Sequence, residues 1–215
     1  MFKIENEPTV ESILMTAYGR VIDWNTAVGK ADWTDQAAVH NQMSVVREEL
    51  LVELAGAHDA KSFVDAICDS FVVVANLFHL VSKGEKYVPK MLTHIKVTDS
   101  AFFLTDGMVA DCLRHADGIQ LILDHICNVM VKYRAWDCIG ALFDVLDNND
   151  DKFMEKELDV GIETVLTYYN HEGVSVEAVD IGDVVWFRRM SDNKVMKPKP
   201  FFEEVDFSNR QVYGV

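Results

Sequence analysis

The sequence is poor in positive charge. Lysine and arginine together number 20 against 35 aspartates and glutamates, which gives a formal net charge of −15 at pH 7. A surface this acidic repels a phosphate backbone, so we expect no general binding to DNA or RNA polymers. The charge does not exclude a single nucleotide that arrives as a metal complex.

Paired cysteines, a signal peptide and long apolar runs are also missing. The four cysteines show no CxxC spacing, which predicts reduced, buried thiols (Cys68, Cys112, Cys127 and Cys138). Residues 1–8 lack the basic and apolar regions of a signal peptide, and no apolar run reaches the length of a membrane span. We therefore expect a cytoplasmic protein that makes no membrane contact.

Apolar residues at helical spacing are the main pattern in the sequence. Apolar residues make up 49% of the 215 residues, enough for one large domain with a proper core. Apolar periodicity, caps and glycines predict helices over residues 9–29, 34–57 with Thr34 as the cap, 59–83 with Asp59 as the cap, 99–147 in pieces broken near Gly107, Gly118 and Gly140, and 155–170. The tail, including 174–176, 184–187 and 195–196, is β-like.

These elements predict a mainly α fold, a helical bundle with a small C-terminal β-hairpin. We expect residues 1–150 to form the helical domain, with an unassigned helical insertion at about 84–140. Residues 151–215 would complete the same domain with a helix and the hairpin.

Two acidic pairs occupy neighbouring predicted helices. Glu49 and Glu53 are four residues apart, as are Asp65 and Asp69. Carboxylates at this spacing share a helix face, and a helical hairpin can turn both pairs toward each other. Converging carboxylates in apolar surroundings repel one another, so a divalent cation is their natural partner. The alternative is that they are ordinary solvated helix carboxylates.

The acidic helices and two later segments resemble the all-α NTP pyrophosphohydrolases, the MazG-like group, and especially its tailed-phage members. Residues 64–69 are similar to the family's DALAD-type helix. Residues 144–153 resemble its EVxxSNxSKF segment, and residues 187–197 resemble its terminal YRxSDGKVxK hairpin. The sequence departs from the usual EExxE pattern at Leu50, where the extra glutamate is Glu48 instead. It also departs from ExxD, where Asp65 lies one position early.

The resemblance implies paired helical hairpins that form an acidic site, and a reaction that cleaves NTP or dNTP to the monophosphate and pyrophosphate. Glu49, Glu53 and Asp69 would be catalytic. The same three, with Asp65 and Glu48, would hold Mg²⁺ or Mn²⁺, which lowers the pKa of a coordinated water. The family also implies a homodimer or homotetramer, and a phage origin would place the protein in the cytoplasm of a bacterial host.

Several further side chains are candidates for substrate binding. Asn76 lies two turns beyond Asp69 on the same face, where its amide could contact a base, and the alternative is a core amide. Trp24 could stack on a nucleobase, although core packing also explains it. Within the matched segments, Lys152, Asn149, Arg188 and Lys194 could contact phosphates, or could belong to a solvated hairpin face.

A second functional class stays open because both acidic motifs are altered. The chain would then be a catalytically weak relative that binds a nucleotide or a protein partner.

Overall fold

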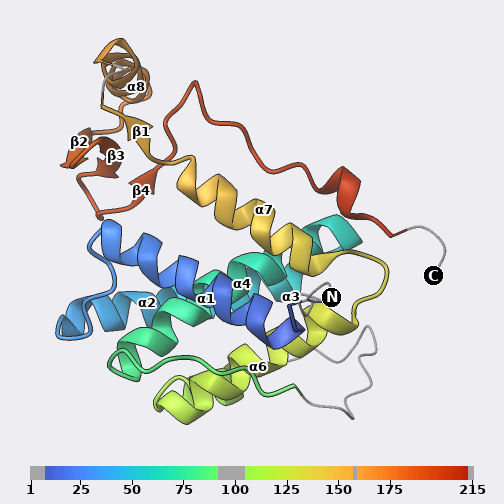
Figure 1. Ribbon diagram of the computed structural model, residues 1–215. Helices are drawn as coiled ribbons and strands as arrows, with labels where there is room; N and C mark the ends of the chain where they lie inside the picture. The colour runs from blue at the N-terminus through green and yellow to red at the C-terminus, as the bar shows by residue number, and fades with distance from the viewer. Residues whose placement is uncertain (1–7, 92–104, 157–158, 213–215) are drawn as a thin grey trace, which may run out of the picture. The chain divides into compact units, whose positions relative to one another are not determined.

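The computed structural model describes residues 8–91, 105–156 and 159–212, and its chain divides into two compact units (Figure 1). The first, called the helical unit, comprises residues up to 143 and from 207, and the second, called the sheet unit, comprises residues 144–206. The fold is mainly helical with a small antiparallel sheet near the C-terminus, as predicted. The boundary between the units falls between residues 143 and 144, inside the helix Cys138–Asp150. The sequence suggested a boundary at residue 150.

The helical unit is built around one long, buried helix. Its elements are α1 (Val10–Ala27), α2 (Gln36–Glu48), a π-helical turn (Glu49–Glu53), α3 (Leu54–Gly56), α4 (Ala60–Val81), α5 (Asp106–Cys112), α6 (Ala116–Lys132) and the start of α7 (Cys138–Asp150). Helices α1, α2 and α6 all pack against α4. Because apolar residues occur nearly all round α4, it can bury several faces at once, and Ile67, Phe71 and Val74 have no exposed surface.

Helix α4 corrects one expectation from the sequence. By length and composition this 22-residue helix could cross a membrane, although no such run was expected. In the structure, 67% of its apolar window is buried inside the protein, as in a core helix.

The helix starts follow local capping chemistry. The side chain of Thr9 caps α1 and that of Asp59 caps α4, where Ser62 completes a capping box. Thr34 was expected to cap the second helix, but Asp35 does so. The reason is that the Thr34 hydroxyl and backbone N–H both donate to Asp32.

The predicted helix breaks near Gly118 and Gly140 are present, whereas residues 92–104 before Gly107 lie outside the described residues. Gly107, Gly118 and Gly140 lie within the first turns of α5, α6 and α7 rather than between helices. Gly140 has a packing role, because a Cβ there would lie 2.1 Å from Asp137 Oδ2. Asp137 pairs with Arg210 of the C-terminal segment and accepts a backbone hydrogen bond from Gly140. The glycine therefore lets the C-terminus dock onto the helical unit.

A buried carboxylate fixes the chain that follows α4. Asp124 of α6 is 4% exposed and accepts hydrogen bonds from the Tyr87 hydroxyl at 2.8 Å and the Lys90 backbone N–H at 2.9 Å. Asn128, one turn later, donates to the Lys90 carbonyl. Burial raises the pKa of Asp124. This network assigns part of the 84–140 region, whereas residues 92–104 lie outside the described residues.

The sheet unit combines a helix with a small antiparallel sheet. Its elements after α7 are β1 (Met154–Glu155), α8 (Asp159–His171), β2 (Val176–Ile181), β3 (Val184–Arg189) and β4 (Val195–Met196). Strand β2 pairs along one edge of β3, while β1 and β4 pair with different parts of its other edge. The predicted hairpin is therefore present as β2–β3 with two short strands added. The predicted helix start at 155 was wrong, because Glu155 belongs to β1.

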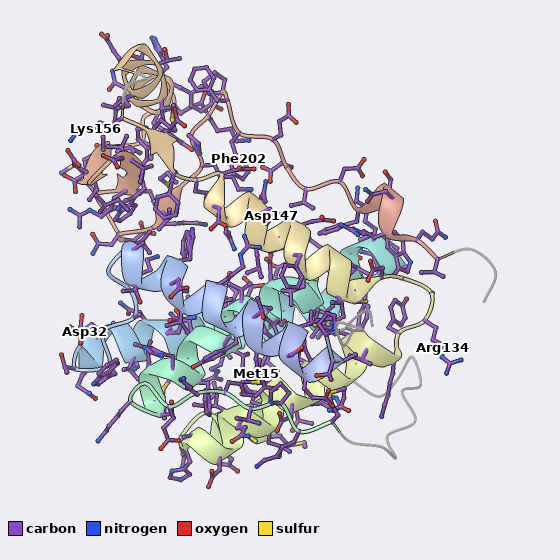
Figure 2. All side chains as sticks on the ribbon, viewed as in Figure 1. Met15, Asp32, Arg134, Asp147, Lys156 and Phe202 are labelled. Carbon is purple, nitrogen blue, oxygen red and sulfur yellow. The ribbon has the colours of Figure 1, made fainter. Side chains whose placement is uncertain are left out.

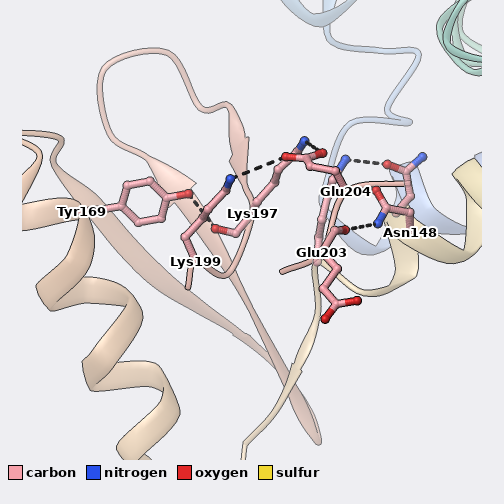
Figure 3. Close-up of polar contacts among 8 residues, drawn as sticks. Asn148, Tyr169, Lys197, Lys199, Glu203 and Glu204 are labelled. Carbon is pink, nitrogen blue, oxygen red and sulfur yellow. Dashed lines mark hydrogen bonds and ion pairs between the residues drawn. The ribbon is translucent and has the colours of Figure 1, made fainter. Parts of the chain in front are cut away.

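The core of the sheet unit lies between α8 and the sheet. Val165 and Tyr169 of α8 pack with Phe187 of β3. The Tyr169 hydroxyl donates to the Lys197 carbonyl at 2.6 Å, and this bond fixes the chain just after β4 (Figure 3).

Candidate functional site

The first acidic pair lies in a widened turn of helix. Helix α2 ends at Glu48, and the backbone N–H of Leu54 then donates to the carbonyl of Glu49, five residues earlier. Such π-helical turns are rare, usually occupy a single turn within α-helices, and are frequent at functional sites. Leu50 and Leu54 are buried on the inner side of this turn. Glu49 is half-buried and Glu53 is exposed.

The second acidic pair lies near the start of α4. Asp65 is exposed and Asp69 is half-buried, while their neighbours Ile67 and Cys68 are fully buried. Helix α4 packs against both α2 and the π-helical turn. The contact with α2 is fixed by the Gln42 side-chain amide, which donates to the carbonyl of Val73 at 2.9 Å. The sequence hypothesis that a helical hairpin brings the acidic segments together therefore has a structural basis.

The pKa of Glu49 reflects the carboxylates that surround it. The pKa of Glu49 is raised from 4.5 to about 7, first by burial and then by the negative charge of Asp69 and of three further carboxylates (Glu53, Glu48 and Asp65). All these contributions act in the same direction, which is what clustered like charges in a partly dry site produce.

The carboxylates are of the ligand type that a hard divalent cation prefers, but their side chains are not arranged around a common metal position. Carboxylate oxygens are the ligands that Mg²⁺ prefers. Among the described residues, however, no group of three or more His, Cys, Asp or Glu side chains has metal-ligand spacing. Ligation by these five carboxylates would therefore need their side chains to change direction. Glu48, Glu53 and Asp65 are exposed, so close packing does not fix their side chains.

Asn76 is the most unusual polar side chain of α4. It is 1% exposed, and neither its amide nitrogen nor its amide oxygen has a hydrogen-bond partner among the described residues. An unpartnered buried amide costs free energy, roughly 1–3 kcal/mol for each group left unsatisfied. The alternative of a core amide bonded to protein groups is therefore not what the structure contains. Trp24 of α1 is half-buried, which leaves its two interpretations open.

The four candidate phosphate ligands all belong to the sheet unit. The Lys152 ammonium donates to the Asn149 side chain, and Arg188 donates twice to Glu177. Lys194 is exposed at the turn before β4. A contact of these residues with the substrate stays a prediction.

The two later segments that carry the resemblance, residues 144–153 and 187–197, both belong to the sheet unit. Figure 3 shows Asn148, from the end of α7, donating to the carbonyl of Glu203 at 2.7 Å. Tyr169 joins α8 to Lys197, whose ammonium pairs with Glu204. Both segments therefore contact the stretch Glu203–Glu204 of the same unit.

Two features of the helical unit were not predicted from the sequence. Nothing in the spacing of Glu49 and Glu53 distinguishes a π-helical turn from an α-helix. Trp33, in the loop between α1 and α2, was not singled out, although it is 42% exposed. A large aromatic residue in the otherwise polar run Asp32–Asp35 was the available signal.

Comparison with known proteins identifies no relative, because no family model, no curated protein and no solved structure matches the chain.

Proposed function

We propose that the protein is a metal-dependent nucleoside triphosphate pyrophosphohydrolase. It would convert an NTP or dNTP to the monophosphate and pyrophosphate. The observation that carries the proposal is the convergence on Glu49 of four other carboxylates, from the α2 end with its π-helical turn and from α4. The resemblance of the acidic helices and of the later segments to the all-α pyrophosphohydrolases supports the same reaction.

Each carboxylate has a role that its position suggests. Glu49, Glu53 and Asp69, assisted by Asp65 and Glu48, would hold Mg²⁺ or Mn²⁺. The ion supplies charge neutralisation for the triphosphate and increases the acidity of a water molecule. A carboxylate of the cluster orients that water and accepts its proton as the oxygen attacks the α-phosphorus. The bond between this phosphorus and the α–β bridging oxygen breaks, and pyrophosphate leaves.

Phosphoryl transfer of this kind depends mainly on positioning and charge stabilisation. The buried apolar side of the π-helical turn and the packing of α4 supply a rigid base for the carboxylates. By the family resemblance, a homodimer or homotetramer is the proposed assembly.

The test is pyrophosphate release from a panel of NTPs and dNTPs, with Mg²⁺, with Mn²⁺ and with EDTA. We expect metal-dependent release that falls about 10²–10³-fold in Glu53→Gln and Asp69→Asn, because each variant removes one charged ligand. Asp117→Asn is the matched control, since Asp117 is an exposed carboxylate on α6 outside the cluster. It should keep wild-type turnover.

Folded wild-type protein without any metal-dependent release would contradict the proposal. Equal losses in Asp117→Asn and Asp69→Asn would also contradict it, because the loss would then not depend on the cluster.

A further inference from the structure

The two acidic segments belong to the two arms of one helical hairpin. Helix α2 with its π-helical turn forms the first arm and α4 the second, and the arms pack against each other. Figure 2 shows side chains filling the space between the helices of the helical unit. At the closed end of the hairpin, only residues 57–59 connect α3 to α4. So short a loop keeps the arms together at that end.

Gln42 attaches the arms at the opposite, open end of the hairpin. Its half-buried side-chain amide donates a hydrogen bond to the carbonyl of Val73 at 2.9 Å. Val46 and Leu50, one and two turns further along the first arm, are buried. Apolar burial attracts the arms without a preferred direction, whereas a hydrogen bond tolerates little change in distance or angle. A single polar residue in an apolar helix interface can therefore specify the register.

The carboxylates lie between these two attachments. Glu49 follows Gln42 by seven residues, which is about two helical turns. Asp69 precedes Val73 by four residues, about one turn of the other arm. Because the arms run in opposite directions, these steps bring Glu49 opposite the stretch of α4 that contains Asp65 and Asp69. These two are also the α4 carboxylates whose charge raises the pKa of Glu49.

Repulsion between the carboxylates opposes this arrangement, because like charges on the two arms push them apart. The amide of Gln42 is uncharged, so it can hold the arms together without neutralising any carboxylate. A lysine or arginine at this position could also reach a carbonyl, but its positive charge would compete with a cation for the same site. An amide is therefore the side chain suited to an attachment beside a cation site.

We propose that Gln42 is a positioning residue, a clamp that holds the hairpin in the register that keeps Glu49 beside Asp65 and Asp69. It would touch neither metal nor substrate and would act through the carboxylates. This inference rests on the proposed function, because the separation of the carboxylates decides how well they share a divalent cation. Residues that orient metal ligands typically change metal affinity or activity 10- to 100-fold when they are replaced.

The first experiment tests the clamp without metal. Gln42→Met keeps the length of the side chain but has no donor. In EDTA, hydrogen exchange of the α2 amides should become about 3- to 10-fold faster in this variant, the factor expected for one lost hydrogen bond. At about 1 M salt the difference should shrink, because the repulsion between the arms is screened.

Gln120→Met is the matched control for this experiment. Gln120 of α6 is also half-buried, and its amide donates the same kind of hydrogen bond to the carbonyl of Val88, at 3.4 Å. The bond lies in the same unit but joins neither arm of the hairpin. The control variant should leave the exchange of the α2 amides unchanged.

Manganese binding measures the consequence for the site. Titrated with Mn²⁺ alone, Gln42→Met should bind about 10- to 100-fold more weakly than wild type, and Gln120→Met should bind like wild type. In turnover, the Mn²⁺ concentration that gives half-maximal rate should rise by the same factor in Gln42→Met. Saturating Mn²⁺ should return kcat to near the wild-type value, because every carboxylate is still present. A variant that had lost its fold would keep a low kcat.

Folded Gln42→Met with the α2 exchange and the Mn²⁺ affinity of wild type would overturn the proposal, and so would equal losses in Gln120→Met. Either result can occur in a protein that cleaves NTPs, so the clamp can fail while the proposed function stands. Conversely, faster α2 exchange in Gln42→Met, in a protein whose wild type binds no Mn²⁺ and releases no pyrophosphate, would support the clamp and contradict the hydrolase.

Discussion

In the helical unit, negative side chains from two segments surround Glu49, whereas in the sheet unit negative side chains face positive ones. Asp180 pairs with Lys156, Glu177 with Arg188, and Asp192 with Arg189. The pKa of Glu49 is raised to about 7, while the pKa of Asp192 is lowered to about 2, chiefly by its hydrogen bond from Arg189. The charges of these three pairs in the sheet unit are matched by the fold, whereas the carboxylates around Glu49 act on it as like charges.

This difference indicates where a ligand contributes most. A pair such as Arg188 and Glu177 gains little from an added ion, because each partner already has its counter-charge. The cluster around Glu49 is destabilised by its own repulsion, so a divalent cation would relieve it and stabilise the folded state. The contrast favours the helical unit as the part that would bind the proposed metal ion.

The largest expected effect is stabilisation by metal. At a Mg²⁺ concentration about 100 times the dissociation constant, binding contributes about 2.7 kcal/mol, which corresponds to roughly 5–10 °C in melting temperature. Asp69→Asn should lose most of the metal-dependent rise, because it removes one of the proposed ligands. The measurement is thermal unfolding followed by far-ultraviolet circular dichroism, with and without Mg²⁺.

Glu177→Gln is the matched variant for this comparison. It removes one carboxylate from the sheet unit and should keep the full response to Mg²⁺. A wild-type melting temperature that does not respond to Mg²⁺ or Mn²⁺ would contradict a metal-binding cluster.

Much of the helical unit followed from local sequence chemistry, and the site only in part. Apolar spacing placed α1, and apolar spacing with the Asp59 cap placed α4, to within a few residues. The choice of Asp35 over Thr34 as a cap depended on Asp32, a competing side chain two residues away. Such competition between neighbouring polar groups is not visible in a spacing pattern.

The acidic site shows why spacing alone is insufficient. The four-residue separation of Glu49 and Glu53 was interpreted on α-helical geometry, but these residues lie in a π-helical turn, where more residues complete each turn. The grouping of the four residues stays a prediction, which the packing of α4 against the π-helical turn supports. Asn76 was predicted from its place on α4. Only the structure shows that its amide has no hydrogen-bond partner among the described residues.

A smaller effect is expected from pH in the absence of metal. Because the pKa of Glu49 is about 7 in the folded protein against an ordinary 4.5, the folded state binds more protons between these values. The free energy of unfolding should therefore fall as pH rises from about 4.5 to about 7, and then level off. Solvent reaches Glu49 and screens its neighbours, so the fall should be about 1–2 kcal/mol.

Denaturant unfolding at a series of pH values in EDTA measures this fall. Glu49→Gln removes the titrating group and should flatten the dependence across that window. Saturating Mg²⁺ should remove or reverse it, because the ion competes with protons for the carboxylates. An unchanged slope in Glu49→Gln would show that other groups carry the dependence.

The smallest effect is expected where charge is already matched. Glu177 and Arg188 lie directly opposite each other on β2 and β3, and both side chains are partly exposed. Exposed pairs contribute about 0.2–1 kcal/mol, so Glu177→Gln should lower the free energy of unfolding by no more than about 1 kcal/mol. The same variant frees Arg188, and if that guanidinium binds a substrate phosphate, the KM for the best NTP should fall while kcat stays constant. A KM equal to that of wild type, together with the small stability loss, would assign Arg188 to the fold of the sheet unit alone.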